Sequence, residues 1–94
     1  MIERHIRFTV PADGEERFRE FIETAYVPPM SDIGGFVSAR LLRPSGGEGE
    51  ILMVLQFEDA AASAGWRESP AHANLQTELK TLHSGMVITG YESL

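Results

Sequence analysis

The chain has 94 residues, 43% of them hydrophobic and 23% charged, no cysteine, and a net charge of -6 from 8 basic and 14 acidic side chains. This size and apolar content predict one globular domain over residues 1–94 and exclude a two-domain enzyme or a disordered tail. No apolar run approaches the ~20 residues that span a bilayer, and no basic stripe is present that would bind nucleic acid or an anionic membrane surface. Without cysteine there are no disulfides, thiolate catalysis or cysteine metal ligands. The first five residues lack the apolar core of a signal peptide, so a cytoplasmic location is expected.

The first third of the chain predicts a strand followed by a helix. Residues 2–10 alternate between apolar and polar side chains, as a strand does when one face is buried. One apolar stripe then recurs at helical spacing and ends in Tyr26. Pro28 and Pro29 are expected to end this helix. Tyr26 and Met30, on either side of the helix exit, are expected to flank the mouth of a pocket.

The middle of the chain predicts a β-hairpin. Residues 35–43 and 50–57 are expected to be its strands, and the Gly-rich cluster between them is the turn. The second of these strands is apolar on both faces, so something must pack on each side of it. Arg40, in the middle of the first, requires a partner, either Glu50 across the hairpin or an anionic ligand.

The last third predicts a helix broken in two and a fourth strand. An alanine-rich helix is expected from Asp59 to Trp66, and Ser69-Pro70 begins the next, with serine as N-cap and proline in the first turn. Residues 86–92 are the predicted fourth strand. The order β-α-β-β-α-β indicates an α+β, ferredoxin-like split βαβ fold with a four-stranded antiparallel sheet and helices on one face. The uncovered face is expected to meet a second copy of the chain in a two-fold homodimer.

The stretch from Trp66 to His72 contains the pattern Trp-x-x-Ser-x-x-His, placed after the third strand and a short alanine-rich helix. In this stretch, and over nearly its whole length, the chain resembles the antibiotic-biosynthesis-monooxygenase (ABM) family. The resemblance implies a dimeric α+β barrel. The family includes oxygenases of anthrone- or quinol-type aromatics that use no metal or flavin, haem-degrading enzymes, and members with no known activity.

The resemblance carries over to individual residues only in part. Trp66 matches a tryptophan that many active members place in the pocket. The anthrone-oxidising branch has an asparagine one turn earlier, where this chain has Ala62, and an arginine on the fourth strand, where residues 84–94 contain none. The haem-degrading branch has an iron-ligating histidine further along the same helical run, where Gln76 stands.

His72 and Trp66 are the candidate catalytic residues. A neutral imidazole titrates near the working pH, so His72 is a candidate base for a phenol or enol proton. The alternative is that His72 hydrogen-bonds Ser69 and only fixes the start of the helix. Trp66 either buries its ring in the core or positions a ligand, and these two roles are compatible.

Five further residues are candidates for substrate binding: Tyr26, Met30, Arg40, Phe57 and Met86. Tyr26 or Arg40 would stabilise an oxyanion, and Phe57 and Met86 would supply soft apolar walls. The three histidines show no metal-ligand spacing, so neither a metal nor a cofactor is expected.

The leading hypothesis is an ABM-like, cofactor-independent monooxygenase that acts on a small aromatic molecule of the anthrone or quinol type. The pocket would lie between the sheet and the helices. The alternatives are a non-catalytic dimeric small-molecule-binding or stress-associated α+β barrel, and haem binding or degradation. The expected partners are a second copy of the chain and a small aromatic molecule.

Overall fold

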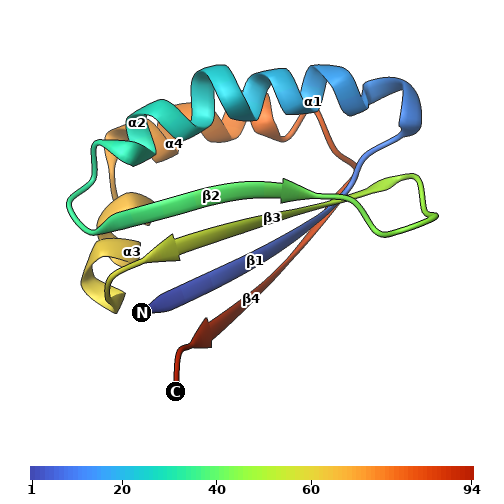
Figure 1. Cartoon of the computed structure of the whole chain (residues 1–94). Helices are drawn as coiled ribbons and strands as arrows, with labels where there is room; N and C mark the ends of the chain where they lie inside the picture. Colours follow the sequence, from blue (N-terminus) through green and yellow to red (C-terminus); the bar gives the residue numbers. More distant parts are fainter.

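The computed structural model describes all 94 residues and has two layers, a sheet and a set of helices on one face of it (Figure 1). The strands pair antiparallel in the order β2-β3-β1-β4. Their bounds are β1 (Ile2–Thr9), β2 (Phe36–Leu42), β3 (Glu50–Phe57) and β4 (Gly85–Glu92). The predicted α+β, ferredoxin-like split βαβ fold with a four-stranded antiparallel sheet is confirmed.

One continuous helical rod separates β1 from β2. It consists of η1 (Ala12–Gly14), α1 (Glu15–Phe21), η2 (Ile22–Tyr26) and α2 (Val27–Ser31). The prediction that Pro28 and Pro29 end the helix is wrong. A π-helical turn, η2, comes just before them and changes the hydrogen-bond register of the rod. Both prolines therefore fall in the first turn of α2, where their missing N–H groups break no established helical bond.

The second helical segment is broken in two, as predicted, into α3 (Ala60–Arg67) and α4 (Pro70–Leu79). Ser69 lies at the break. Its hydroxyl accepts a hydrogen bond from the backbone N–H of His72 at 3.1 Å and donates one to the backbone carbonyl of Trp66 at 2.7 Å. The serine therefore ties the end of α3 to the beginning of α4. No helix of the chain is long and apolar enough to cross a membrane.

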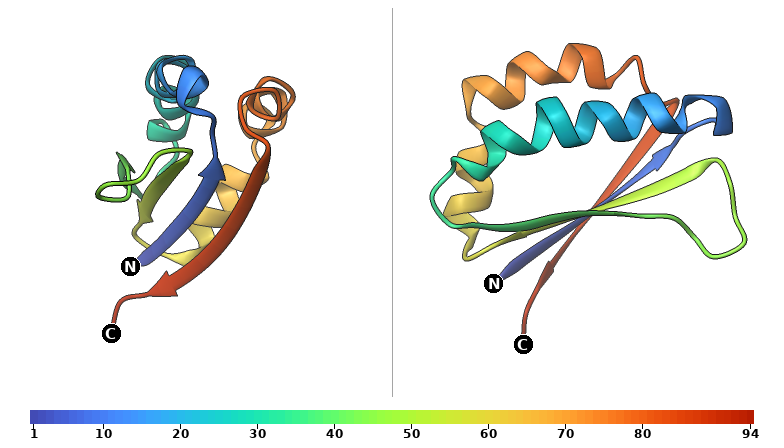
Figure 2. Two further views of the ribbon diagram at one scale, coloured as in Figure 1. Left: turned by 90° about the vertical axis from the view of Figure 1, so that its right-hand side faces the viewer. Right: turned by 45° about the horizontal axis from the view of Figure 1, so that its top comes forward.

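The core lies between the helices and one face of the sheet (Figure 2). Alternate side chains of β1 and β3 point into this layer and meet the apolar stripe of the first rod. The largest side chains with almost no exposed surface are Phe8, Phe18, Ile22, Met30, Met53, Leu55, Phe57, Trp66 and Leu79. The apolar pattern of the sequence thus becomes a single core.

The opposite face of the sheet has no helix over it (Figure 2). This face carries a row of polar side chains. Ser38 donates to Gln56, and Gln56 donates to Glu3, each at 2.8 Å. The other carboxylate oxygen of Glu3 lies 2.7 Å from His5 Nε2, and the His5 ring lies 4.7 Å from that of Tyr91. This row, which we call the polar row, crosses all four strands.

The exposed apolar surface gathers on β4 rather than on β3. Val54, which points to the open face of β3, is only 3% exposed because it lies in register between the longer side chains of His5 and Arg40. On β4, by contrast, large apolar side chains are exposed on both faces: Met86, Val87, Ile88 and Tyr91. The expectation that β3 needs cover on its second face is therefore largely met within one chain.

Candidate functional site

A cavity of about 160 Å³ lies between the sheet and the second helical segment. We call it the Trp66 cavity. Its apolar lining comes from the sheet and from the end of α4: Ile6, Phe8, Leu55, Leu79, Met86 and Ile88. Its polar or aromatic lining comes from β1, η2, α3 and α4: Arg4, Tyr26, Trp66, Arg67, His72 and Gln76. An apolar hollow with a few converging polar groups is the usual form of a small-molecule site.

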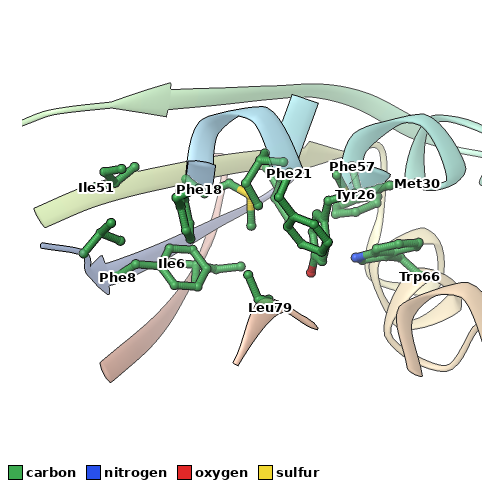
Figure 3. Packing of buried hydrophobic residues seen from close by; sticks show 14 of the residues in the cluster. Ile6, Phe8, Phe18, Phe21, Tyr26, Met30, Ile51, Phe57, Trp66 and Leu79 are labelled. Carbon is green, nitrogen blue, oxygen red and sulfur yellow. The ribbon is translucent and has the colours of Figure 1, made fainter. Parts of the chain in front are cut away.

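Trp66 forms the inner wall of this cavity. Its ring packs edge-on against Tyr26 on one side, with 5.4 Å between centroids, and against His72 on the other, at 5.3 Å. The side chain is 2% exposed, yet its indole N–H has no hydrogen-bond partner. Figure 3 shows that this nitrogen points toward the Tyr26 hydroxyl. Trp66 is therefore both a core residue and a wall of the cavity. Its indole N–H is directed at the Tyr26 hydroxyl and lowers the pKa of that phenol, although the two groups are not in hydrogen-bond geometry.

The imidazole of His72 faces the cavity. The bond to Ser69 is made by the His72 backbone N–H, so the ring itself does not hold the start of α4. The ring Nε2 lies 3.2 Å from the side-chain nitrogen of Gln76, one turn along α4. Burial, and then the positive charges of Arg4 and Arg67, lower the pKa of His72. The ring is therefore neutral at neutral pH, the state in which it accepts a proton.

Tyr26 reaches the cavity because the rod continues past it. It is the last residue of η2, and π-helical turns of this kind occur often at functional sites. The side chain is 2% exposed, and burial raises the pKa of its phenol. The hydroxyl therefore stays protonated and can donate a hydrogen bond to a bound ligand.

Two arginines complete the cavity, and neither was among the sequence candidates. Arg4 comes from β1, where it alternates in phase with Ile6 and Phe8 and is half-buried. Arg67, from the last turn of α3, is exposed at the rim. The sequence feature that could have identified Arg4 is its position in phase with the apolar residues of the strand. A charged side chain on the core-facing side of a strand is rarely buried without a partner, so this position indicates a binding role.

The cavity brings together four of the seven sequence candidates: His72, Trp66, Tyr26 and Met86. Met30 and Phe57 have no exposed surface and are core residues that do not line it. Periodicity marks both as buried, but it cannot tell a side chain behind a pocket wall from one that forms the wall.

Arg40 lies elsewhere. A register shift between Phe36 and Ser38 places Phe36 on the helix-covered face and Arg40 on the open face, opposite Val54. Glu50 does not pair with it, because this carboxylate lies 2.9 Å from Arg7 Nε. The expected hairpin salt bridge is therefore wrong.

A second cavity, of about 340 Å³, lies between the first rod and β2. Arg40 borders it, together with a charged rim in which Glu15 forms an ion pair with Arg43. No histidine, tyrosine or tryptophan lines it. Although it is larger, it offers no group that would exchange a proton near neutral pH. No group of three or more His, Asp or Glu side chains in the chain is arranged so that it could hold a metal ion.

A sequence model described as "Antibiotic biosynthesis monooxygenase" (ABM) matches residues 1–78. The chain belongs to the ABM family. The match includes every residue that lines the Trp66 cavity except Leu79 at the end of α4 and Met86 and Ile88 of β4. No curated protein matches the sequence.

Solved structures share the fold of this ABM protein. A monooxygenase from the gene ActVA-Orf6 of Streptomyces coelicolor, in complex with the ligand Nanaomycin D, superposes with a TM-score of 0.86 at 16% identity, over 99% of this chain and 87% of that one. SnoaB, a cofactor-independent oxygenase from Streptomyces nogalater, gives 0.81 at 22% identity, over 98% and 91%. Rv0793 from Mycobacterium tuberculosis gives 0.81 at 20% identity, over 99% and 94%.

Proposed function

We propose that this ABM protein is a cofactor-independent monooxygenase whose substrate is a small aromatic molecule bound in the Trp66 cavity. One observation carries the proposal: a neutral histidine, a protonated tyrosine and an unpaired indole N–H line the same apolar cavity. These are the groups needed to remove a proton from an acidic ring and to stabilise the anion that results.

The size of the cavity favours a quinol-type ring over a larger one. An apolar cavity of about 150 Å³ holds benzene, and this one measures about 160 Å³. A tricyclic anthrone would have to extend out of it. The exposed side chains of Met86 and Ile88 line the β4 side of the cavity, so a longer ligand would extend there.

In the proposed reaction His72 takes a proton from an acidic phenol or an activated ring carbon of the substrate. To do so, the substrate displaces the Gln76 amide from His72 Nε2. Tyr26 donates to the oxygen that becomes negative, and Trp66 holds the ring. The carbanion passes an electron to dioxygen, and the two radicals combine into a peroxide anion. The protonated His72 returns its proton to this anion to give a hydroperoxide, and loss of water then leaves a carbonyl. One oxygen atom enters the product and the other leaves as water, so the substrate supplies every electron.

We also propose that the protein acts as a homodimer that covers β4. Large apolar side chains are exposed on both faces of this edge strand, and an exposed apolar edge strand invites pairing with another chain. The polar row carries both charge signs, with Glu3 beside His5 and with Arg7 and Arg40 near it. A face that holds both signs can be complementary to itself across a two-fold axis, which favours a second copy.

The test is oxygen uptake by the purified protein with a panel of naphthoquinol- and anthrone-type substrates. Uptake above the spontaneous rate, with a chelator present and no cofactor added, is the expected result. The control is the same concentration of a His72→Gln variant. Uptake and spectra equal to those of the buffer blank across the panel would contradict the monooxygenase proposal.

One contact favours the alternative of a non-catalytic binding protein in the same cavity. The Gln76 amide occupies the ring nitrogen of His72 that a base would use. Ligands that raise the melting temperature without any oxygen uptake would support this alternative. A haem titration belongs in the same series, and a Soret shift that depends on His72 would point to haem binding instead.

A further inference from the structure

We propose that the ligand of the Trp66 cavity is an aromatic carboxylate, and that Arg4, assisted by Arg67, binds its carboxylate group. This inference rests on the function proposed above, because it names a second feature of the same ligand. It is carried by two arginines that line the cavity and have no acidic partner.

Arg4 is placed to meet a ligand rather than solvent. On the helix-covered face of β1 it lies in register between Leu55 of β3 and Gly90 of β4. The glycine has no side chain, and a Cβ built there meets nothing within 4 Å. Space is therefore open on the β4 side of the Arg4 side chain, next to the cavity that this arginine lines.

Neither Arg4 nor Arg67 forms an ion pair or a side-chain hydrogen bond. The chain has an excess of acidic residues, 14 against 8 basic ones, yet none of them lines this cavity. Other arginines do find acids, since Arg7 pairs with Glu50 and Arg43 pairs with Glu15. The Trp66 cavity is therefore a positively charged hollow in a negatively charged molecule.

The two guanidinium groups also act on each other unfavourably. Burial lowers the pKa of Arg4, and the charge of Arg67 lowers it further. A guanidinium stays protonated throughout the physiological range, so this cost remains until an anion is bound. A carboxylate would relieve it and would accept the paired N–H donors of an arginine in the planar geometry that they favour.

The carboxylate would also orient the ring for the proposed reaction. Arg4, Tyr26 and His72 line the same small cavity, so a ligand in it can contact all three. A substrate anchored on Arg4 would present its ring to Trp66 and to the imidazole. Arg4 and Arg67 therefore act as specificity residues, and His72 as the base.

The test uses Trp66, which is the only tryptophan of the chain and a wall of the cavity, as a fluorescent reporter. The ligands are 2-naphthoate and its neutral analogue 2-naphthamide, which share a ring and differ in charge. We expect the naphthoate to bind the wild-type protein about tenfold more tightly than the amide, the usual size of a charge-assisted hydrogen-bonded pair. In Arg4→Gln this preference is expected to fall to about onefold while the affinity for the amide is kept.

Three further variants test the roles of the two arginines. Arg67→Gln is expected to reduce the preference by a smaller factor, because Arg67 is exposed at the rim. Arg17→Gln, an exposed α1 arginine that does not line the cavity, is the control and keeps the full preference. If Arg4→Gln fails to fold, Arg4→Lys keeps the charge without the guanidinium fork and is expected to show an intermediate preference.

Equal affinities for the two ligands in the wild-type protein would overturn the inference, as would a preference that survives in Arg4→Gln. If the amide binds and quinols are oxidised but no preference for the carboxylate is found, only this inference fails. If neither ligand changes the Trp66 fluorescence and the quinol panel also gives no uptake, the proposed function fails with it.

Discussion

The side chains of the Trp66 cavity hold one another in fixed charge states. His72 is kept neutral by burial and by the nearby cations, and Tyr26 is kept protonated by burial. Arg4 remains a cation although it is half-buried. A neutral acceptor, a neutral donor and a cation are therefore available together at neutral pH. This is an arrangement that can remove a proton and then stabilise negative charge.

Replacing His72 by glutamine tests the role of the base. Glutamine keeps the size and polarity of the side chain but accepts no proton, so turnover should fall by about 10²–10⁴-fold while the melting temperature is retained. In the wild-type protein the rate should be constant at neutral pH and fall as the pH drops through the pKa of His72. Because burial and the nearby arginine charges lower that pKa from its usual value of 6.5, the midpoint of the fall should lie below pH 6.5.

The measurement is the initial rate of oxygen uptake against pH for both proteins, with far-UV circular dichroism to confirm folding. A His72→Gln variant with wild-type turnover would refute the assignment of the base. So would a wild-type rate that falls as the pH rises from acid to neutral, because the neutral imidazole is the active form.

Gly35 is a residue at which backbone geometry admits only glycine. Its φ is 91°, and an added Cβ would lie 2.6 Å from the Cβ of Ala62 on α3. Gly35→Ala should therefore lower the free energy of unfolding by at least about 1–2 kcal/mol, the cost of the left-handed backbone alone. Gly34→Ala is the matched control, because a Cβ at Gly34 meets nothing within 4 Å. Urea unfolding measures the free energies of unfolding of both variants. Equal values for Gly35→Ala and Gly34→Ala would contradict the close packing of Gly35 against Ala62.

At the scale of the elements, two irregular helices position the cavity side chains. The π-helical turn η2 lets the first rod pass through Pro28 and Pro29 and leaves Tyr26 facing the second helical segment. The break between α3 and α4 changes the chain direction between Trp66 and His72, so that their rings meet edge-on. In a continuous helix, residues six positions apart would lie on different faces.

Ser69 holds this break, and its removal should therefore affect both stability and function. Ser69→Ala loses the N-cap bond to the His72 amide and the bond to the Trp66 carbonyl, so the free energy of unfolding should fall by about 1 kcal/mol. Oxygen uptake and ligand binding should also weaken, because the angle between α3 and α4 sets the position of His72.

Asp59→Ala provides the matched control for Ser69→Ala. Asp59 caps α3 by accepting the backbone N–H of Ala62 at 2.9 Å, far from the break between the helices. It should cost a similar amount of stability and leave ligand binding unchanged at a temperature where both variants are folded. Equal losses of binding in the two variants would show that Ser69 acts only through global stability.

At the scale of the whole molecule, the helices cover one face of the sheet and leave the other open (Figure 2). The open face carries the polar row, and the apolar part of the exposed surface is concentrated on the edge strand β4. Met86 and Ile88 of that strand also line the Trp66 cavity. A copy that covered β4 would therefore close the cavity on its open side.

We expect the protein to sediment as a dimer at micromolar concentration and Val87→Arg to convert it to a monomer. Val87 is 59% exposed and lies in register with Arg7 on the open face, so the variant places two cations side by side where apolar contact is expected. Asn74→Arg, on the exposed side of α4, is the control and should stay dimeric. Sedimentation velocity over a range of concentrations measures this, and a monomeric wild-type protein would refute the proposed dimer.

Much of the fold follows from the sequence because its signals are local. Alternation along residues 2–10, the apolar stripe ending at Tyr26 and the cap at Ser69 each depend on neighbouring residues, and each was predicted correctly. The end of the first helix was not predicted correctly. Two prolines end a helix only if the helical hydrogen-bond register does not change just before them. The π-helical turn that makes this change has no simple sequence pattern.

Some residues of the candidate site could likewise be found from the sequence, and others could not. Trp66 was selected through the resemblance to the ABM family and His72 through the chemistry of its imidazole, and the rings of these two residues lie edge-on to each other at the cavity. Arg40 was a candidate for substrate binding, but it does not line the Trp66 cavity, because a β-bulge between Phe36 and Ser38 puts Arg40 on the open face and no local pattern marks that bulge. Arg4 becomes a site residue only when β1 lies next to β4 and beneath α4, segments far from it in the sequence.

The sequence by itself thus determined the elements and the chemistry available, since these depend on residue type and spacing. Only the tertiary structure decided which side chains share a cavity. Strand register and helix packing bring together segments that are far apart in the sequence, and no local pattern in either segment indicates that they meet.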